Sequence, residues 1–201
     1  MTNDRVNSHG PQFTDDQLAL RGNRFPPLKV NEMTPEQHAM VDAVMTGKRA
    51  SMQGPYNVLL RSPEMGMLAQ AFGEQTRFGS SLALRLNELA ILLVAKDWSC
   101  QFMWHAHRAI GIKAGLAEAV VDAIAKREEP EGLKDDEAVV LRFCRELLTD
   151  RRVGDETFAV AKAAFGERGL VDLMGTMAYY TLVAMALNVD GYPVPADSER
   201  I

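Results

Sequence analysis

Apolar residues recur every three or four positions along most of the chain, and they nowhere alternate with polar residues over the length of a strand. This spacing places the apolar side chains on one face of an α-helix. The sequence therefore predicts an all-α fold of about seven or eight helices. The expected helices cover residues 35–48, 62–79, 83–96, 101–113, 117–127, 136–149, 155–165 and 170–188.

Several of these helices carry clear start and stop signals. The run Thr34-Pro35-Glu36-Gln37 combines an N-cap threonine, a proline at the first helical position and a capping-box glutamine. Ser62-Pro63-Glu64 repeats this pattern in part. Gly79, Gly115 and Gly166 follow expected helices, where glycine commonly ends the helical conformation.

The 201 residues correspond in length to one domain. The first 30 residues are polar and end in Phe25-Pro26-Pro27, which predicts an extended arm over 1–30, a helical domain over 31–195 and a tail over 196–201. The N-terminal residues contain no apolar stretch that would act as a signal peptide, so we expect a cytoplasmic protein.

One segment raises the question of a membrane. Residues 173–189 carry no formal charge over 17 positions, which is at the lower limit for crossing a bilayer. The segment contains Gly175, Thr176, Asn188 and two tyrosines, and no cluster of Lys or Arg flanks it. We therefore expect a helix buried in a core or between subunits, and no membrane.

Composition excludes some classes of partner and of protein. A net charge of −5 and a pI near 5.4 argue against nucleic acid, because Lys48-Arg49 and Arg151-Arg152 are isolated basic pairs. Two cysteines, Cys100 and Cys144, cannot form the disulfide framework of a small secreted domain. Cys144 lies in the apolar run 139–144, which favours a buried structural thiol.

The rare reactive residues gather in one predicted helix. Cys100 and His107 are seven positions apart and so lie within about 20° of each other on one face, with Met103 between them. His105 points almost opposite to His107, so the His-x-His spacing does not predict a metal site on a helix. We expect neither a metal nor a cofactor.

Glu88 lies among apolar residues in the expected helix 83–96. A buried carboxylate there needs an ion pair or a hydrogen bond, or it takes up a proton. Arg85 and Asn87 leave open the alternative that Glu88 belongs to a solvent-facing edge of the same helix.

Glu88, Cys100, Met103 and His107 together resemble the signature of alkyl hydroperoxidase D. A broader resemblance to carboxymuconolactone decarboxylase-like proteins covers about residues 25–195. It is carried by the segments 54–60 (GPYNVLL), 62–64 (SPE), 77–79 (RFG), 88–92 (ELAIL) and 179–184 (YYTLVA). Met103 occupies the place of the second redox cysteine, so the resolving thiol of the hydroperoxidase pattern is missing.

The resemblance implies a pocket with a proton relay. His107 would act as general acid or base, Glu88 would fix its tautomer, and Cys100 would be a thiolate stabilised by His107 and the helix N-terminus. Arg77 or Arg108 would bind a substrate carboxylate. The expected walls around a small organic substrate are Trp98, Phe102, Met103, Trp104 and Tyr56.

Three functions remain open from the sequence. The first is a cofactor-free decarboxylase or lyase acting on a small carboxylated or lactone-like metabolite. The second is a single-cysteine hydroperoxide reductase that uses Cys100. The third is a non-catalytic binding protein, and the resemblance implies trimers or hexamers of identical chains.

Overall fold

The computed structural model describes residues 12–196, 198, 200 and 201, and within these it contains nine α-helices, one 3₁₀ turn and no strand. The all-α prediction is confirmed. The helices are α1 (Asp15–Leu18), α2 (Pro35–Thr46), α3 (Tyr56–Leu59), α4 (Pro63–Phe78), α5 (Leu84–Asp97), α6 (Gln101–Lys113), α7 (Glu118–Lys126), α8 (Asp135–Thr149) and α9 (Asp155–Asp190), with the 3₁₀ turn η1 at Val30–Glu32.

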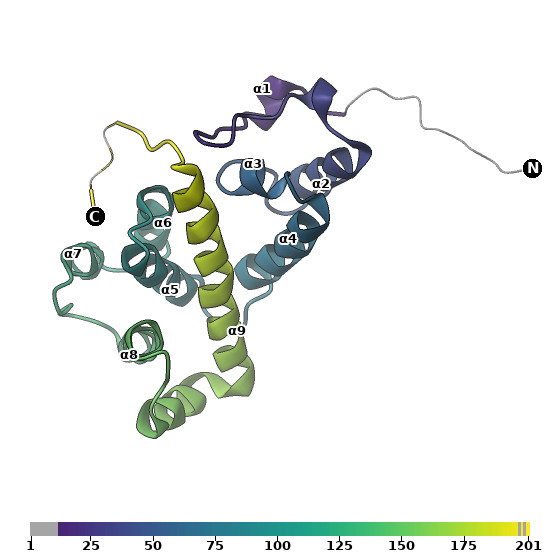
Figure 1. Ribbon diagram of the computed structural model, residues 1–201. Helices are drawn as coiled ribbons and strands as arrows, with labels where there is room; N and C mark the ends of the chain where they lie inside the picture. The colour runs from purple at the N-terminus through teal and green to yellow at the C-terminus, as the bar shows by residue number, and fades with distance from the viewer. Residues whose placement is uncertain (1–11, 197, 199) are drawn as a thin grey trace, which may run out of the picture.

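Helix α9 runs through the centre of the fold, with other helices on both sides of it (Figure 1). Helices α5 and α6 lie on one side of it and α2, α3 and α4 on the other, with α7 and α8 beyond α5. Helix α5 packs against α6, α8 and α9, and α4 packs against α9. A residue on α5, α6 or the second half of α9 therefore lies near the centre of the molecule.

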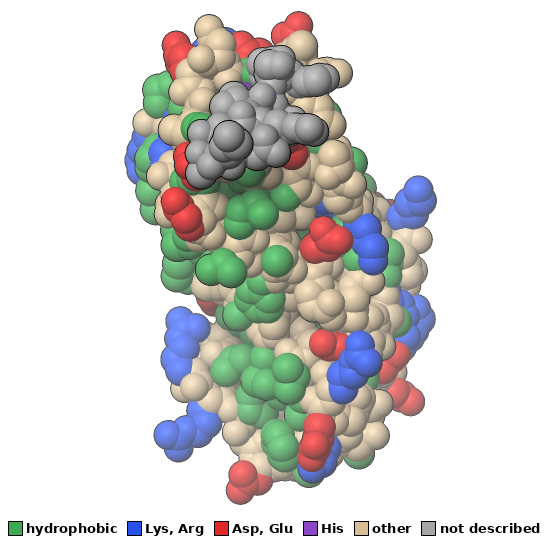
Figure 2. Space-filling model, turned by 90° about the vertical axis from the view of Figure 1, so that its right-hand side faces the viewer, with side chains coloured by type: hydrophobic (Ala, Val, Ile, Leu, Met, Phe, Trp, Pro, Cys, Tyr) green, Lys and Arg blue, Asp and Glu red, His purple; other side chains and the backbone are tan. Residues whose placement is uncertain are grey.

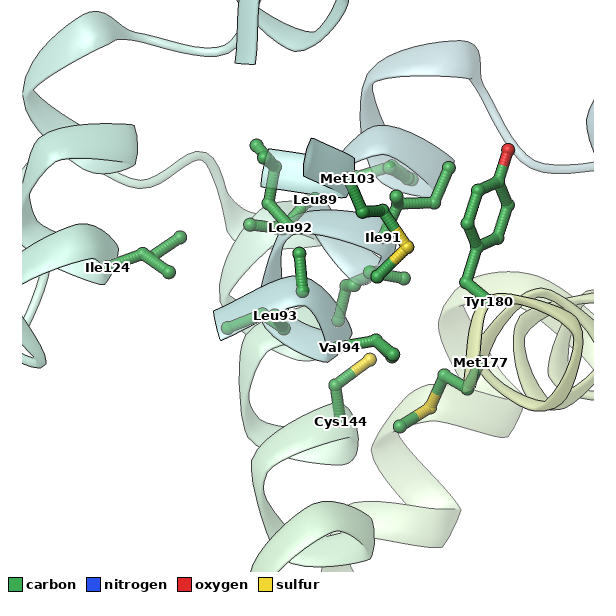
Figure 3. Close-up of a cluster of buried hydrophobic side chains, with 14 of the residues drawn as sticks. Leu89, Ile91, Leu92, Leu93, Val94, Met103, Ile124, Cys144, Met177 and Tyr180 are labelled. Carbon is green, nitrogen blue, oxygen red and sulfur yellow. The ribbon is translucent and has the colours of Figure 1, made fainter. Parts of the chain in front are cut away.

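The hydrophobic core is centred on α5. Its buried residues include Leu89, Ile91, Leu92 and Val94, which meet side chains of α6, α7, α8 and α9 (Figure 3). Cys144 of α8 lies in this cluster and is fully buried, so the predicted structural role of its thiol is confirmed.

Most helix boundaries agree with the sequence, including the predicted break at Gly166. The element α9 contains both expected helices, 155–165 and 170–188, which are separated by a kink at Gly166, where φ is +67° and the backbone is not helical. Glycine adopts this angle without strain, so the first helix ends there as predicted and the second begins in a new direction. The segment after Gly54-Pro55 contains the short helix α3, which the sequence did not predict.

Helix α9 is also the segment that raised the membrane question. By length and composition it would cross a bilayer, but 56% of its most apolar window is buried within the protein. Leu173, Tyr179, Tyr180 and Ala184 belong to the hydrophobic core. The prediction that this segment is a buried core helix agrees with the structure.

The N-terminal arm lies against the end of α9. Residues 1–11 of the predicted arm fall outside the described residues. In the described part, Asp190 accepts hydrogen bonds from the backbone N–H groups of Asn23 (3.1 Å) and Phe25 (2.8 Å). The arm is not extended throughout, because Thr14 and Gln17 form a capping box that starts the four-residue helix α1.

Candidate functional site

Glu88 and His107 form a buried pair between two packed helices. Glu88 lies in the middle of α5 and is 1% exposed, and His107 lies on α6 and is 8% exposed. The Nδ1 atom of His107 is 2.7 Å from Oε2 of Glu88. The alternative that Glu88 belongs to a solvent-facing edge is therefore wrong, and the carboxylate has the partner that its burial requires.

The carboxylate determines the tautomer of the imidazole. A carboxylate accepts hydrogen bonds, so Nδ1 of His107 carries a proton and donates it to Glu88. The second ring nitrogen, Nε2, is then left to exchange a proton with a ligand. The pair therefore consists of a residue capable of acid–base chemistry, His107, and a carboxylate that holds it in one orientation.

His107 forms part of the wall of a cavity of about 240 Å³. The cavity lies between α6, α9, the end of α4 and the loop that follows α2. Its walls comprise Arg49, Ser51, Gln53, Gly54, Pro55, Arg77, Phe102, Met103, Ala106, His107, Ile110, Tyr179, Tyr180, Val183 and Leu187. A small organic molecule would meet both apolar side chains and a few polar groups there.

Tyr180 of α9 lies edge-on to His107, with ring centroids 5.0 Å apart and an interplanar angle of 86°. Its side chain is 3% exposed, and its hydroxyl has no hydrogen-bond partner among the described residues. Burial raises the pKa of Tyr180, so the hydroxyl stays protonated and is a hydrogen-bond donor at neutral pH. In Figure 3 this hydroxyl points away from the hydrophobic cluster.

The predicted substrate-binding residues separate into two groups. Arg77, Phe102 and Met103 line the cavity, as expected. Trp98, Trp104 and Tyr56 do not, which corrects the prediction for these three aromatic side chains. Trp104 is buried in the core, and Tyr56 lies behind Arg49, with its hydroxyl donating to Oε1 of Gln70 at 2.5 Å.

Cys100 faces a different hollow from His107. It is the N-cap residue of α6 and lines a depression of about 160 Å³ together with Asn188, Gly191 and Tyr192. Phe102 and Leu187 line both spaces and so form the wall between them. The seven-residue spacing therefore does not bring the thiol and the imidazole into one cavity.

The environment of Cys100 also opposes the predicted thiolate. Burial raises the pKa of the thiol to about 11, although a hydrogen bond from the backbone N–H of Met103 acts in the opposite direction. The expectation that the helix N-terminus and His107 would lower this pKa is wrong, because desolvation has the larger effect.

The two histidines of the His-x-His segment diverge as predicted. His105 is exposed, with Nδ1 3.0 Å from the hydroxyl of Ser198, whereas His107 is buried at the cavity. Among the described residues, no group of three or more His, Cys, Asp or Glu side chains is placed to hold a metal ion.

Arg49 is one of the cavity residues that the sequence did not indicate as part of a site. It follows α2 in a loop, and its guanidinium carbon is 4.8 Å from the centroid of the Tyr56 ring. From the sequence it belonged only to an isolated basic pair. Arg108, the alternative to Arg77 as a carboxylate ligand, instead forms ion pairs with Glu118 and Asp122.

Comparisons with known proteins identify the fold. No protein-family model matches the sequence, and no curated protein is significantly similar to it. Solved structures do match. One is described as an alkylhydroperoxidase AhpD core, an uncharacterized peroxidase-related protein from Ralstonia eutropha; it has a TM-score of 0.70 at 15% identity and covers 87% of this chain and 93% of its own.

Two further structures agree with the first. An uncharacterized peroxidase-related protein from Silicibacter sp. has a TM-score of 0.66 at 14% identity over 89% of this chain and 93% of its own. A protein of unknown function from Agrobacterium tumefaciens, described as a putative antioxidant defence protein AhpD, has a TM-score of 0.62 at 16% identity over 72% of this chain and all of its own.

The chain therefore has the alkyl hydroperoxidase D-like fold, as the resemblance predicted. At these identities the likeness extends to the fold alone, so the carboxymuconolactone decarboxylase-like branch stays a prediction.

Proposed function

We propose that the protein is a cofactor-free enzyme that catalyses proton transfer with loss of carbon dioxide from a small carboxylated or lactone-like metabolite. The observation that carries the proposal is the Glu88–His107 pair, 2.7 Å long and buried at the wall of a cavity that Cys100 does not line. General acid–base chemistry needs a titratable group that is oriented and can reach the substrate, and His107 meets both requirements.

In the proposed step, the bond between the carboxyl carbon and the substrate ring breaks and carbon dioxide leaves. The electron pair passes into a conjugated carbonyl group, and the carbon then takes a proton from Nε2 of His107. Atoms and charge balance without an oxidant or a metal. Glu88 is a positioning residue here, because it holds the imidazole in one orientation through Nδ1.

A second candidate is a single-cysteine hydroperoxide reductase. Two of the matched structures are described as peroxidase-related proteins, and Cys100 lies at the start of α6. The thiolate would cleave the O–O bond to give an alcohol and a sulfenic acid, which two equivalents of an external thiol would reduce. The raised pKa of Cys100, and Met103 in place of a second thiol, count against it.

The non-catalytic binding protein is less well supported than either enzyme. A sealed pocket around Glu88 and His107 would favour it, but the His107 side chain remains 10% exposed at the cavity. A purely structural pair would not need this access to solvent.

The test uses His107→Gln, Glu88→Gln and Cys100→Ser, with His105→Gln as the matched control. Release of carbon dioxide is measured from carboxylated lactones and from small keto acids, and consumption of cumene hydroperoxide is measured with a thiol reductant. We expect His107→Gln to abolish decarboxylation, and Cys100→Ser and His105→Gln to retain it. Glu88→Gln should lower kcat and shift the pH profile.

The opposite pattern would support the reductase. If hydroperoxide is consumed at a rate that depends on Cys100 and not on His107, the second candidate holds. Release of no carbon dioxide from any compound of the panel would overturn the decarboxylase proposal.

The proposal also includes a cytoplasmic location and association of identical chains. Both described cysteines are free thiols. Large hydrophobic side chains remain exposed on α4 and on the adjacent part of α9, and Figure 2 shows hydrophobic groups gathered on the face that α2 and α4 present. Contiguous exposed apolar surface of this kind is typical of protein–protein contact.

A further inference from the structure

The wall of the cavity beside His107 contains basic side chains but no acidic one among the described residues. Two arginines, Arg49 and Arg77, contribute to its wall, and none of the described residues that line it is Asp or Glu. Glu88 stands behind His107 and is engaged by it. This is unusual in a protein with a net charge of −5, where carboxylates outnumber basic side chains.

The other half-buried arginines of the described chain all have oxygen partners. Arg61 donates to main-chain carbonyl groups, Arg85 pairs with Asp136 and Glu137, Arg108 pairs with Glu118 and Asp122, and Arg145 pairs with Glu129.

Arg49 and Arg77, also half-buried, have no hydrogen bond or ion pair with any described residue, and each lies over an aromatic ring, Arg49 over Tyr56 and Arg77 over Phe78. The Nε atom of Arg49 is buried without a hydrogen-bond partner. An unpaired guanidinium is costly to bury, so its persistence at one cavity indicates a partner that arrives with the ligand.

A third unpaired donor lies in the same wall. The Tyr180 hydroxyl is buried and has no partner among the described residues, and both Arg49 and Arg77 act on it electrostatically. Arg49, Arg77 and Tyr180 therefore belong to the wall of one cavity, in which Tyr180 contacts the imidazole of His107.

We propose that Arg49 and Arg77 form an anion subsite that selects the substrate by its carboxylate, and that the Tyr180 hydroxyl donates a hydrogen bond to a carbonyl oxygen of the same molecule. The ligand is a small organic acid with a second oxygen function. This inference rests on the proposed function for the role of His107, but the subsite itself is a matter of binding.

Binding without turnover tests the subsite. Isothermal titration calorimetry compares 2-furoate with its neutral amide, 2-furamide, which has nearly the same shape. We expect the wild-type protein to bind 2-furoate more tightly than 2-furamide. Arg49→Gln and Arg77→Gln should each weaken 2-furoate about tenfold and leave 2-furamide unchanged, since each removes a charge-assisted hydrogen bond.

Matched controls separate binding from folding. Arg142→Gln removes an exposed arginine that pairs with Glu146 and Glu156 away from the cavity, and it should change nothing. Arg49→Lys keeps the charge and should lie between wild type and Arg49→Gln. Tyr180→Phe should weaken both probes, because both carry the furan ring oxygen as the second oxygen function.

His107→Gln distinguishes this inference from the proposed function. We expect it to retain discrimination between the two probes, whether or not the protein releases carbon dioxide. Equal affinity of wild type for 2-furoate and 2-furamide, no binding of 2-furoate at millimolar concentration, or equal effects of Arg49→Gln and Arg142→Gln would overturn the anion subsite.

Discussion

At the scale of single residues, Glu88 is a carboxylate in the middle of a helix whose neighbours are almost all buried and apolar. The hydrogen bond with His107 offsets the desolvation of the carboxylate, and each group leaves the other unsatisfied if it is removed. The pair is therefore a contributor to stability as well as a candidate for chemistry.

We expect Glu88→Ala to lower the free energy of unfolding by about 1–3 kcal/mol, because it leaves a buried imidazole without its partner. Urea denaturation followed by circular dichroism measures the change. Glu64→Ala, at an exposed position on α4, should stay within about 0.5 kcal/mol of wild type. Equal effects of the two substitutions would contradict the contribution of the pair.

The thiol of Cys100 provides a second prediction at this scale. With a pKa near 11 in place of 9.0, its thiolate fraction at pH 7 is about one hundredth of that of an ordinary cysteine. We expect alkylation of Cys100 by iodoacetamide to be slow at neutral pH and to accelerate tenfold per pH unit up to about pH 11. Mass spectrometry of the labelled peptide follows the rate.

Rapid labelling of Cys100 at pH 7 would contradict this picture and strengthen the case for the hydroperoxide reductase. The same raised pKa of Cys100 also makes the free energy of unfolding depend on pH. The unfolded thiol ionises at a lower pH than the folded one, so this stability contribution is complete below about pH 9 and is lost as the pH rises towards 11.

Local sequence indicated some site residues and could not indicate others. Glu88 and His107 could be predicted from the sequence, because Glu88 lies among apolar residues of a predicted helix and His107 lies seven positions after Cys100. Arg49 could not be, because a loop after α2 brings it to the cavity and nothing in Lys48-Arg49 distinguishes it from a surface pair. The contrast between Cys100 and His107 also required the structure, since Phe102 and Leu187 separate them.

At the scale of elements, α4 and α9 approach each other closely at Gly73. A Cβ atom there would lie 2.3 Å from the ring of Tyr179, which is almost fully buried and contributes to the cavity wall. The absence of a side chain at Gly73 therefore allows α4 to lie close to α9 at the cavity wall.

We expect Gly73→Ala to destabilise the protein by about 1–3 kcal/mol through overpacking, despite the higher helix propensity of alanine. Gly175→Ala is the control on α9, because its Cβ would meet Phe72 at an ordinary 3.5 Å. The control should be neutral or stabilising by up to about 1 kcal/mol. Thermal unfolding of both variants tests the difference, and equal behaviour would contradict it.

The helix boundaries are the part of the fold that the sequence patterns predict well. The range 101–113 predicted for α6 agrees with Gln101–Lys113, and α2, α4, α5, α7 and α8 agree within two residues at each end. Gly166 was predicted to end a helix, and the backbone is non-helical there, so α9 consists of two helices that meet at a kink. The four-residue helices α1 and α3 are too short for a periodic signal.

At the scale of the whole molecule, the exposed hydrophobic side chains of α4 are the basis for the proposed association of chains. Leu68 is 75% exposed and Met65 53%, and the ring of Phe72 lies over Gly175 of α9. Phe72 also contacts Tyr179, with ring centroids 5.8 Å apart, so the exposed face is one side chain away from the cavity.

We expect the wild-type chain to elute as an oligomer and Leu68→Glu to shift it towards the monomer, because a charge in the centre of an apolar contact is poorly solvated. Light scattering after size exclusion measures the mass. Phe158→Glu introduces the same charge at an exposed position in the first half of α9 and should leave the mass unchanged. A monomeric wild type would contradict the proposal.

Helix α9 also has a consequence for how the protein tolerates insertions. One uninterrupted segment after Gly166 supplies Tyr180 to the cavity, Leu173 to the core and Asp190 to the N-terminal arm. A single residue added within this segment would rotate everything after it by about 100° and displace two of these three contacts together. The turn between α7 and α8 supplies no described residue to the cavity, so changes in chain length should accumulate there and spare the second half of α9.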